Sequence, residues 1–448
     1  PNPVANATEL TDLNTTSRLL GNGYAELDIT PSVRLRTTLG GNFQFDKINF
    51  FAPRTIQPGG PGGSGWIFSG ETRDLTNENT VSYRRDAVGP GTLDLLGGFS
   101  VQTFHSDNVR GNSATFPTDA TTVFALGSGA QLQAPESGVT EAALLSYLGR
   151  ANYNIAGKYL FTATGRYDGS SRFGRNNKWA FFPSGAFAWR VSEENFMANR
   201  RSTISDLKLR LSYGQVGNQA VDPYQSLARL NTQWYAFAGT EFPALAPGNA
   251  MPNPDLRWEK QKQFNVGIDA AFLNDRLTLS LDRYSSKTED LLLSVTIPST
   301  TGFTSQLRNI GTVRNRGLEL SLNTVNFENE RFSWRSSLSI AGNRNKVVIL
   351  GTALNSAGDR VNLEQILISA RGGGFLAGDT HIIRRYQPLG AIFGWQVIGL
   401  WQPSDTVLQP GGTRICHLKN RAECTPGEYR IADVNGDSVI NAADRQIL

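Results

Sequence analysis

Apolar and polar residues alternate with a period of two along most of this chain. Residues 277–282, for example, carry leucine at every second position, and Thr, Ser and Asp fill the positions between. The same alternation recurs in residues 93–102, 159–168, 207–213, 264–272 and 332–340. Because successive side chains of a β-strand point to opposite faces, this pattern predicts a sheet whose strands each have one apolar and one polar face.

The number and length of these segments favour a membrane barrel over a soluble sandwich. We count roughly 13 to 15 strands of about 9 to 12 residues, which is the length that crosses a bilayer as a tilted strand. The chain is 39% hydrophobic and contains no run of about 18 apolar residues, which excludes a helical membrane protein. The predicted fold is therefore all-β, a transmembrane antiparallel β-barrel. Leu279 and Leu320 are expected to face lipid, and Ser280 and Glu319 to face the lumen.

Residues 1–448 show no helical run, no Pro/Ser-rich linker and no change in composition, so we expect them to belong to a single barrel domain. The chain starts without Met and stops at Leu448, directly after an acidic segment. A barrel must close in lipid, because unpaired edge strands would leave backbone groups without partners. We therefore expect this sequence to be part of the barrel of a longer protein, with the first and last strands missing.

The charge pattern argues against a nucleic-acid partner. The net charge is +4, but the basic residues are dispersed and fall on predicted polar strand faces, as Arg34, Arg166 and Arg210 do. No basic cluster is interleaved with aromatic residues, which nucleic-acid binding would favour. Solvated or lumenal charge is the simpler interpretation, and a lumen that favours anionic solutes is the weaker one.

The chain has only two cysteines, Cys416 and Cys424, and both lie in one polar segment. Such a pair fits one disulfide formed in an oxidising compartment. His417 next to Cys416 raises the alternative of a metal site, but further ligands at zinc-like spacing are missing. His105 and His381 are isolated in the sequence and are expected at the surface.

A series of short motifs runs through the chain from Leu145 to its end. They are RYDGSSRFG at 166–174, LRLSYGQVGNQ at 209–219, NPDLRWE at 253–259, the run from Tyr284 to Leu292, NIGTVRNRGLE at 309–319, QPLGAIFGWQVIGLWQ at 387–402 and ADVNGDSVINAADR at 432–445. In this order and spacing they resemble the SusC/RagA-like branch of TonB-dependent outer-membrane transporters. Ser286 departs from the family, which often has Lys at that position.

The resemblance implies a barrel of about 22 strands around a plug domain. It also implies active import of a bulky nutrient, an oligosaccharide or a peptide, across the outer membrane of a Gram-negative, Bacteroidota-like bacterium. The implied partners are a SusD-like surface lipoprotein, outer-membrane lipid and the TonB energy-coupling complex. The TonB complex would act through an N-terminal region that this sequence does not show. The plug is likewise not visible in this sequence.

One acidic segment has the spacing of a calcium loop. In DVNGDSVINAAD, oxygen-bearing side chains stand at positions 1, 3, 5, 9 and 12, and a backbone carbonyl is available at position 7. The candidate ligands for a Ca²⁺ ion are Asp433, Asn435, Asp437, Val439, Asn441 and Asp444. Residues 433–444 are expected within an extracellular loop of the barrel. The alternative is a turn held by Asx hydrogen bonds without an ion.

Catalysis finds no support in the sequence. No G-x-S-x-G, H-E-x-x-H or phosphate-binding G-x-x-x-x-G-K pattern occurs, and no organic cofactor is expected. Glu193 and Glu194 are expected as solvated charges in a turn after Trp189. Trp66, Trp234, Trp258, Trp395 and Trp401 are candidates for interfacial girdle or glycan-stacking residues. Two alternatives to active import remain, a passive porin and a soluble calcium-dependent adhesion or scaffold module.

Overall fold

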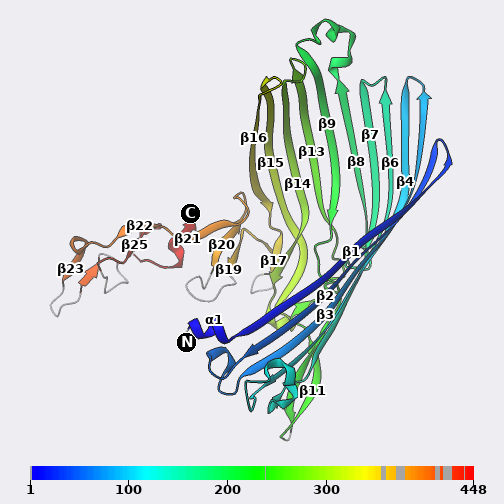
Figure 1. Cartoon of the computed structure of the whole chain (residues 1–448). Coiled ribbons are helices and arrows are strands. Elements are labelled where there is room, and N and C mark those ends of the chain that lie inside the picture. Colours follow the sequence, from blue (N-terminus) through cyan, green and yellow to red (C-terminus); the bar gives the residue numbers. More distant parts are fainter. Residues whose placement is uncertain are drawn as a thin grey trace.

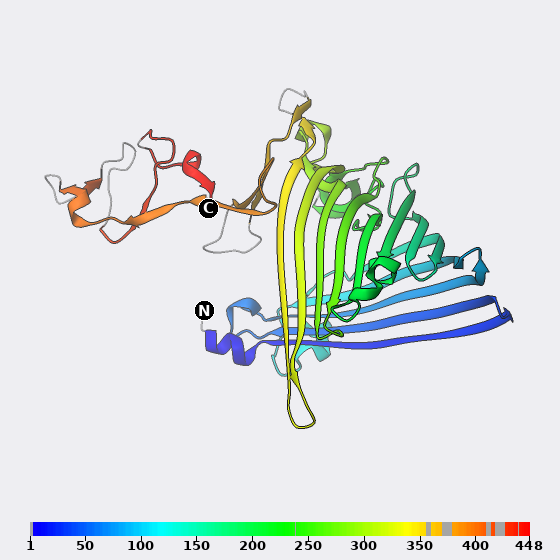
Figure 2. The ribbon, with the colours of Figure 1, turned by 90° about the horizontal axis from the view of Figure 1, so that it is seen from above.

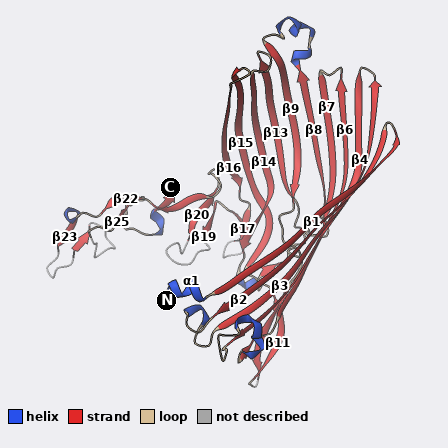
Figure 3. Cartoon of the chain, in the orientation of Figure 1, coloured by secondary structure: helices blue, strands red, loops and turns tan. Residues whose placement is uncertain are grey.

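The computed structural model describes residues 3–237, 239–354, 360–369, 379–408, 414–416, 426–437 and 439–448. In these residues one large curved sheet of 14 strands dominates the molecule (Figures 1 and 3). Its long strands are β1 (Thr11–Thr30), β2 (Val33–Ala52), β3 (Ser64–Val88), β4 (Gly91–Ala114), β6 (Glu136–Ile155), β7 (Tyr159–Ser170), β8 (Trp179–Arg190), β9 (Ile204–Asn218), β13 (Glu259–Phe272), β14 (Leu277–Thr296), β15 (Ser305–Glu328) and β16 (Ser333–Ile349). Two short strands, β5 (Gln131–Leu132) and β12 (Ala250–Met251), pair with β4 and β15.

The long strands form an up-and-down meander, because each is hydrogen-bonded to the next long strand along the chain. All these pairs are antiparallel, and within the described residues the only parallel pair of this sheet is that of β12 with β15. Antiparallel neighbours can be joined by short turns, and the alternating sequence provides strands for such an arrangement. The all-β, antiparallel prediction is confirmed.

The predicted strand length is wrong for most of the sheet. β3 has 25 residues and β4 and β15 have 24 each, whereas β7 and β8 have 12. The additional residues continue the ladder beyond an apolar stretch. In β3, for example, the segment ETRDLTNENT has Leu75 as its only apolar residue and still pairs with β2 and β4. Counting only the residues needed to cross a bilayer therefore underestimates how far these strands extend.

The connections between long strands differ between the two ends of the sheet. At one end of the sheet, which we call the short-connection end, the strands are connected by residues 31–32, 89–90, 156–158, 191–203, 273–276 and 329–332. Residues 53–63, 115–135, 171–178, 219–258 and 297–304 connect them at the other, the long-connection end. Membrane barrels have short periplasmic turns and longer extracellular loops. By this rule, we expect the long-connection end to be the extracellular end.

The pairing register divides the sheet into an apolar face and a polar face. One row of apolar residues crosses five neighbouring strands, each residue directly opposite the next. The row consists of Leu209 on β9, Ile268 on β13, Leu281 on β14, Leu320 on β15 and Ile340 on β16. The same ladders bring the polar residues of these strands together on the other face, where Asp282 is opposite Glu319 and Ser280 is opposite Ser321. The predicted separation of Leu279 and Leu320 from Ser280 and Glu319 is confirmed.

The large sheet ends at β16, and the following residues form smaller sheets that extend away from it (Figure 2). Their strands are β17 (Thr352–Leu354), β18 (Arg360–Asn362), β19 (Gln365–Ser369), β20 (Asp379–Arg384), β21 (Ala391–Trp395), β22 (Val397–Leu400), β23 (Thr406–Leu408), β24 (Arg414–Cys416), β25 (Tyr429–Ile431) and β26 (Arg445–Ile447). A further hairpin, β10 (Leu230–Phe237) with β11 (Thr240–Pro247), belongs to the long-connection end. That residues 350–448 belong to the same barrel domain stays a prediction.

Helices are few and short in the described part of the chain. They are α1 (Pro3–Glu9) and the 3-10 helices η1 (Gln57–Gly59), η2 (Thr122–Ser128), η3 (Val191–Glu193), η4 (Asn195–Arg200), η5 (Ser299–Thr301), η6 (Pro403–Asp405) and η7 (Ala442–Asp444). Within these residues, no helix has both the length and the apolar character needed to span a membrane.

Candidate functional site

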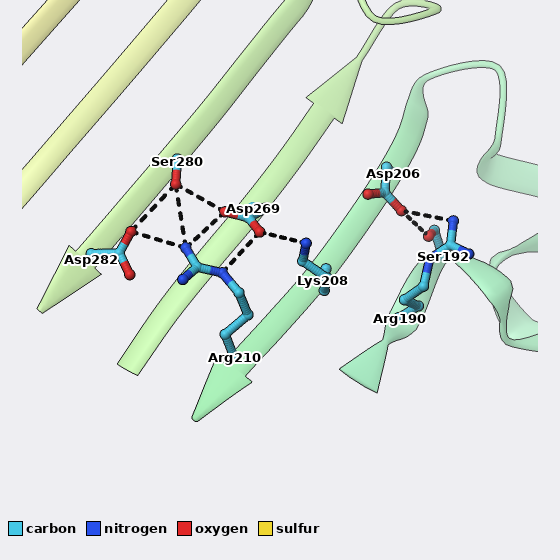
Figure 4. Close-up of polar contacts among 8 residues, drawn as sticks. All are labelled: Arg190, Ser192, Asp206, Lys208, Arg210, Asp269, Ser280 and Asp282. Carbon is cyan, nitrogen blue, oxygen red and sulfur yellow. Dashed lines mark hydrogen bonds and ion pairs between the residues drawn. The ribbon is translucent and has the colours of Figure 1, made fainter. Parts of the chain in front are cut away.

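A network of charged side chains crosses three strands of the polar face (Figure 4). The Arg210 guanidinium, from β9, donates two hydrogen bonds of 2.8 Å to the carboxylate of Asp269 on β13. The same guanidinium donates a third, of 2.9 Å, to Asp282 on β14. Lys208 Nζ lies 2.8 Å from Asp269, and Ser280 Oγ donates to Asp269 at 2.9 Å. Two cations and two carboxylates thus neutralise one another.

A glycine makes this crossing sterically feasible. Gly267 lies on β13 between Arg210 and Asp282, which it pairs with on either side. A Cβ atom at Gly267 would lie 2.5 Å from Asp282 Oδ1 and 2.7 Å from Arg210 Cζ. Either distance is too short for a real contact, so a side chain here would displace the guanidinium. No local pattern indicates this role of Gly267, because residues 210, 267 and 282 are far apart along the chain.

A second charged group lies on the polar face at β6 and β7. Arg166 Nε donates to Asp168 Oδ1 at 2.7 Å, and Arg166 Nη2 donates to Ser146 Oγ at 2.9 Å. Asp168 and Ser146 are buried. The polar face therefore carries positive and negative side chains in pairs, and this pairing supports the interpretation of its arginines as lumenal charge.

Several motifs of the sequence converge in one hydrophobic cluster at the long-connection end. Phe173 from RYDGSSRFG packs on Trp258 from NPDLRWE, with 4.8 Å between ring centroids, and Phe182 contacts Trp258 edge-on. Gly174 donates its backbone N–H to the carbonyl of Leu256 at 3.0 Å. A Cβ at Gly174 would collide with the Pro254 carbonyl, so the two motifs approach more closely than any other residue allows.

Polar residues of the same motifs hold the adjoining loops. Asn309 donates to the Arg257 carbonyl at 2.7 Å and accepts from the Arg257 backbone N–H at 3.0 Å. The buried Glu259 accepts hydrogen bonds from the Asn218 side chain and the Leu292 backbone. Every one of these contacts joins segments that are distant in sequence. These motifs therefore contribute to the wall and anchor its loops.

The connection between β8 and β9 holds a carboxylate that the sequence suggested was solvated. Glu194 accepts hydrogen bonds from Tyr159 Oη at 2.6 Å, Lys158 Nζ at 3.0 Å and Trp189 Nε1 at 3.1 Å. Its side chain is only 15% exposed. These donors, the Tyr159 hydroxyl above all, lower the pKa of Glu194 from its usual 4.5 to about 2. The expected turn is present, but Glu194 fastens it to β7 and β8.

The acidic loop predicted to bind calcium lies between β25 and β26. Its backbone is folded by its own side chains: Asp433 Oδ1 accepts from the Gly436 N–H at 2.8 Å, and Asp437 Oδ1 accepts from the Val439 N–H at 2.7 Å. Gly436 has a φ of +73°, which few other residues adopt. The loop therefore has the Asx turns of the alternative interpretation.

Asp444 holds the two ends of the acidic loop together through hydrogen bonds to its backbone. It is fully buried, and its two carboxylate oxygens accept the backbone N–H groups of Val434 at 3.0 Å and Asn441 at 2.8 Å. These hydrogen bonds, led by that of Asn441, lower the pKa of Asp444. Among the described residues, no three Asp, Glu, His or Cys side chains gather as a metal ion would require. Calcium binding by Asp433, Asn435, Asp437, Val439, Asn441 and Asp444 stays a prediction.

The other candidate residues have varied surroundings. Trp258 and Trp401 are buried and so do not form a girdle, whereas Trp234 and Trp395 are exposed and Trp66 stacks on Phe50. His105 is not isolated, since its ring nitrogens lie 3.0 Å from Glu141 and 3.3 Å from Asp107. His381 is exposed, as expected. The predicted Cys416–Cys424 disulfide lies outside the described residues, because Cys424 and the Cys416 side chain are not described.

Comparison with protein families and solved structures gives one consistent result. Residues 1–364 match the family described as TonB dependent receptor-like, beta-barrel. TonB-dependent receptor P3 of Formosa agariphila is 35% identical over 448 residues, all of this chain and 43% of the relative. TonB-dependent receptor SusC of Bacteroides thetaiotaomicron is 32% identical over 373 residues, 79% of this chain and 36% of the relative. The chain thus spans less than half the length of these relatives.

The fold is also that of a solved transporter. A structure of the RagAB peptide importer in the closed-closed state superposes with a TM-score of 0.77 at 22% identity, covering 98% of this chain and 45% of that chain. A second structure, of the RagAB peptide transporter, gives a TM-score of 0.78 at 23% identity, with 99% and 45% covered.

Proposed function

The chain belongs to the family of TonB-dependent receptor-like β-barrels, and from this membership we propose that it forms part of the wall of an active importer of the bacterial outer membrane. The observation that carries the proposal is the two-faced sheet. One face presents an unbroken apolar row, suited to lipid, and the other presents paired charges and hydroxyl groups, suited to water. Relatives from Formosa and Bacteroides favour a Bacteroidota-like host.

The solute is proposed to be a bulky oligosaccharide or peptide. Because Arg210 is neutralised by Asp269 and Asp282, and Arg166 by Asp168, the polar face offers hydrogen-bonding groups without a strong net field. Such a wall suits a large polar solute better than a small ion. A peptide importer among the solved structures of the same fold supports this choice by analogy.

The proposed partners are an inner-membrane energy coupler of the TonB type and a SusD-like surface lipoprotein. Both would act with the intact protein. The role is transport without covalent chemistry, so no enzymatic activity is proposed. A passive porin and a calcium-dependent adhesion module are the alternatives, and family membership supports neither.

Uptake with and without the energy coupler tests the proposal. Cells that carry the intact protein are expected to take up the solute, or to grow on it, only while the coupler is present. Disruption of the gene for the protein is the control, and the two deletions should have the same effect. Uptake that persists unchanged in the coupler deletion would contradict active import and support a passive porin.

A further inference from the structure

The apolar face of the sheet becomes strongly basic toward its long-connection end. Lys262 on β13 stands opposite Lys287 on β14, Lys287 stands opposite Arg314 on β15, and Arg314 stands opposite Lys346 on β16. Four cations thus occupy one cross-strand row, which we call the cationic row. Like charges directly opposite one another destabilise a sheet. Negative charge placed near the cationic row would therefore stabilise this part of the sheet.

The cationic row lies at the margin of the apolar surface. Two residues toward the short-connection end, about 7 Å along each strand, Arg316 stands opposite Arg344. Two residues further lies Leu318, and then comes the apolar row that contains Leu320 and Ile340. All of these positions share one face, because the ladder between them has no register shift. The cations are therefore attached to the same side of the wall as the apolar row.

The protein itself supplies little countercharge there. Glu289 pairs with Lys262 and Lys287, both at 2.6 Å. Lys346 lies over the ring of Tyr386, with 5.0 Å from Nζ to the ring centroid.

The three arginines, Arg314 of the cationic row and the adjacent Arg316 and Arg344, have less countercharge than the lysines. In the residues that the structure describes, no carboxylate forms an ion pair with Arg314, Arg316 or Arg344. Arg316 and Arg344 are exposed. One carboxylate faces at least six cations, and most of the positive charge is left to an external partner.

An external anion at this place must also sit beside an apolar surface. Lipid headgroups meet both conditions, since their phosphates lie directly above the hydrocarbon that an apolar barrel face contacts. Guanidinium groups match phosphate by paired, charge-assisted hydrogen bonds. We propose that the cationic row, with Arg316 and Arg344, binds the phosphate groups of anionic lipids in the leaflet at the long-connection end. The proposal requires the barrel wall but not the import activity.

Native mass spectrometry of the intact protein with bound lipid tests this site. The protein is equilibrated in micelles with equal amounts of phosphatidylglycerol, which is anionic, and phosphatidylcholine, which is zwitterionic. Wild type should retain phosphatidylglycerol preferentially, and the preference should fall as salt rises. The triple variant Arg314→Gln, Arg316→Gln, Arg344→Gln should bind it roughly 100-fold more weakly, at about fivefold for each cation near an anionic surface.

A matched control removes the same charge from the other face. The triple variant Arg34→Gln, Arg36→Gln, Arg150→Gln should keep the wild-type preference, because these positions lie on the polar side. If the first triple variant does not fold, the single variant Arg344→Gln should still show about a fivefold loss. Equal retention of both lipids by wild type, or equal losses in the two triple variants, would overturn the proposal. Displacement of the bound lipid by millimolar inorganic phosphate would also overturn it, because the site would then recognise free anions.

Discussion

Arg210 shows how one side chain can join three strands of this sheet. Its guanidinium binds the neighbouring strand through Asp269 and the next strand through Asp282. Both carboxylates lie on the polar face, as alternation predicts, but alternation cannot predict that they meet. The meeting depends on register between distant segments and on the missing side chain of Gly267. Alternation therefore predicts the face on which each of these residues lies but not the network that they form.

Gly267→Ala tests whether the missing side chain matters. The added Cβ would lie 2.5 Å from Asp282 Oδ1, so the Arg210 bridge must shift or break. We expect the free energy of unfolding to fall by about 1 to 3 kcal/mol, as for other overpacked sites. Gly342→Ala on β16 is the control, because nothing lies within 4 Å of its Cβ position. Equal stability of the two variants in denaturant titrations would refute the steric role of Gly267.

Glu194 should make stability depend on pH in acid. Its pKa is about 2 in the folded protein and 4.5 ordinarily, so the unfolded chain takes up a proton first as pH falls. The stabilisation by ionised Glu194 is complete above about pH 4.5 and is lost progressively as pH falls toward 2. Wild type should therefore exceed Glu194→Gln in unfolding free energy at pH 6, and the difference should shrink below pH 4.5. A difference that stays constant down to pH 2.5 would contradict this assignment.

At the scale of elements, the period-two pattern predicted the type and the facing of the strands but not their extent. Facing follows from the pleat, which is local, so Leu320 and Ser321 could be assigned from neighbouring letters alone. Extent depends on whether a partner strand continues alongside. β3 keeps partners on both sides through its polar segment and so reaches 25 residues. The hydrophobic pattern has no information about those partners.

The loop between β25 and β26 is the element whose chemistry is still a prediction. Asp433 and Asp437 already accept hydrogen bonds from the backbone. Both carboxylate oxygens of Asp444 also accept hydrogen bonds from backbone N–H groups of the loop. If Ca²⁺ binds, the ion adds to a turn that is ordered without it. At 100 times its dissociation constant it should stabilise the loop by about 2.7 kcal/mol. Hydrogen exchange across residues 431–448 with calcium, magnesium or chelator measures this.

Two variants separate the ion from the turn. The double variant Asp433→Ala, Asp437→Ala should abolish the response to calcium, whereas Asp444→Ala should expose the loop backbone even in chelator. Magnesium should protect the loop less than calcium, since its smaller octahedral shell fits such a loop poorly. Exchange that is the same with calcium and with chelator would show that hydrogen bonds alone order these residues.

At the scale of the whole molecule, the alternation of apolar and polar residues and the short motifs determine different parts of the structure. Alternation specifies a wall with two faces, and it could be read from the sequence without any relative. The motifs specify how loops fold onto that wall, as Trp258 and Phe173 do at the long-connection end. Their meaning came from resemblance to a family, because contacts between residues 173 and 258 leave no local signature. Neither level identifies the solute.

The most direct test of the two-faced wall compares two adjacent residues of β15. Leu320 lies in the apolar row between Leu281 and Ile340, and Ser321 lies opposite Ser280 and Ser339 on the polar face. Each is replaced by Arg, and the free energy of unfolding of the intact protein is measured in liposomes. Leu320→Arg should cost about 2 to 4 kcal/mol, whereas Ser321→Arg should cost less than about 1 kcal/mol. Equal losses for the two variants would contradict the assignment of one face to lipid and the other to the lumen.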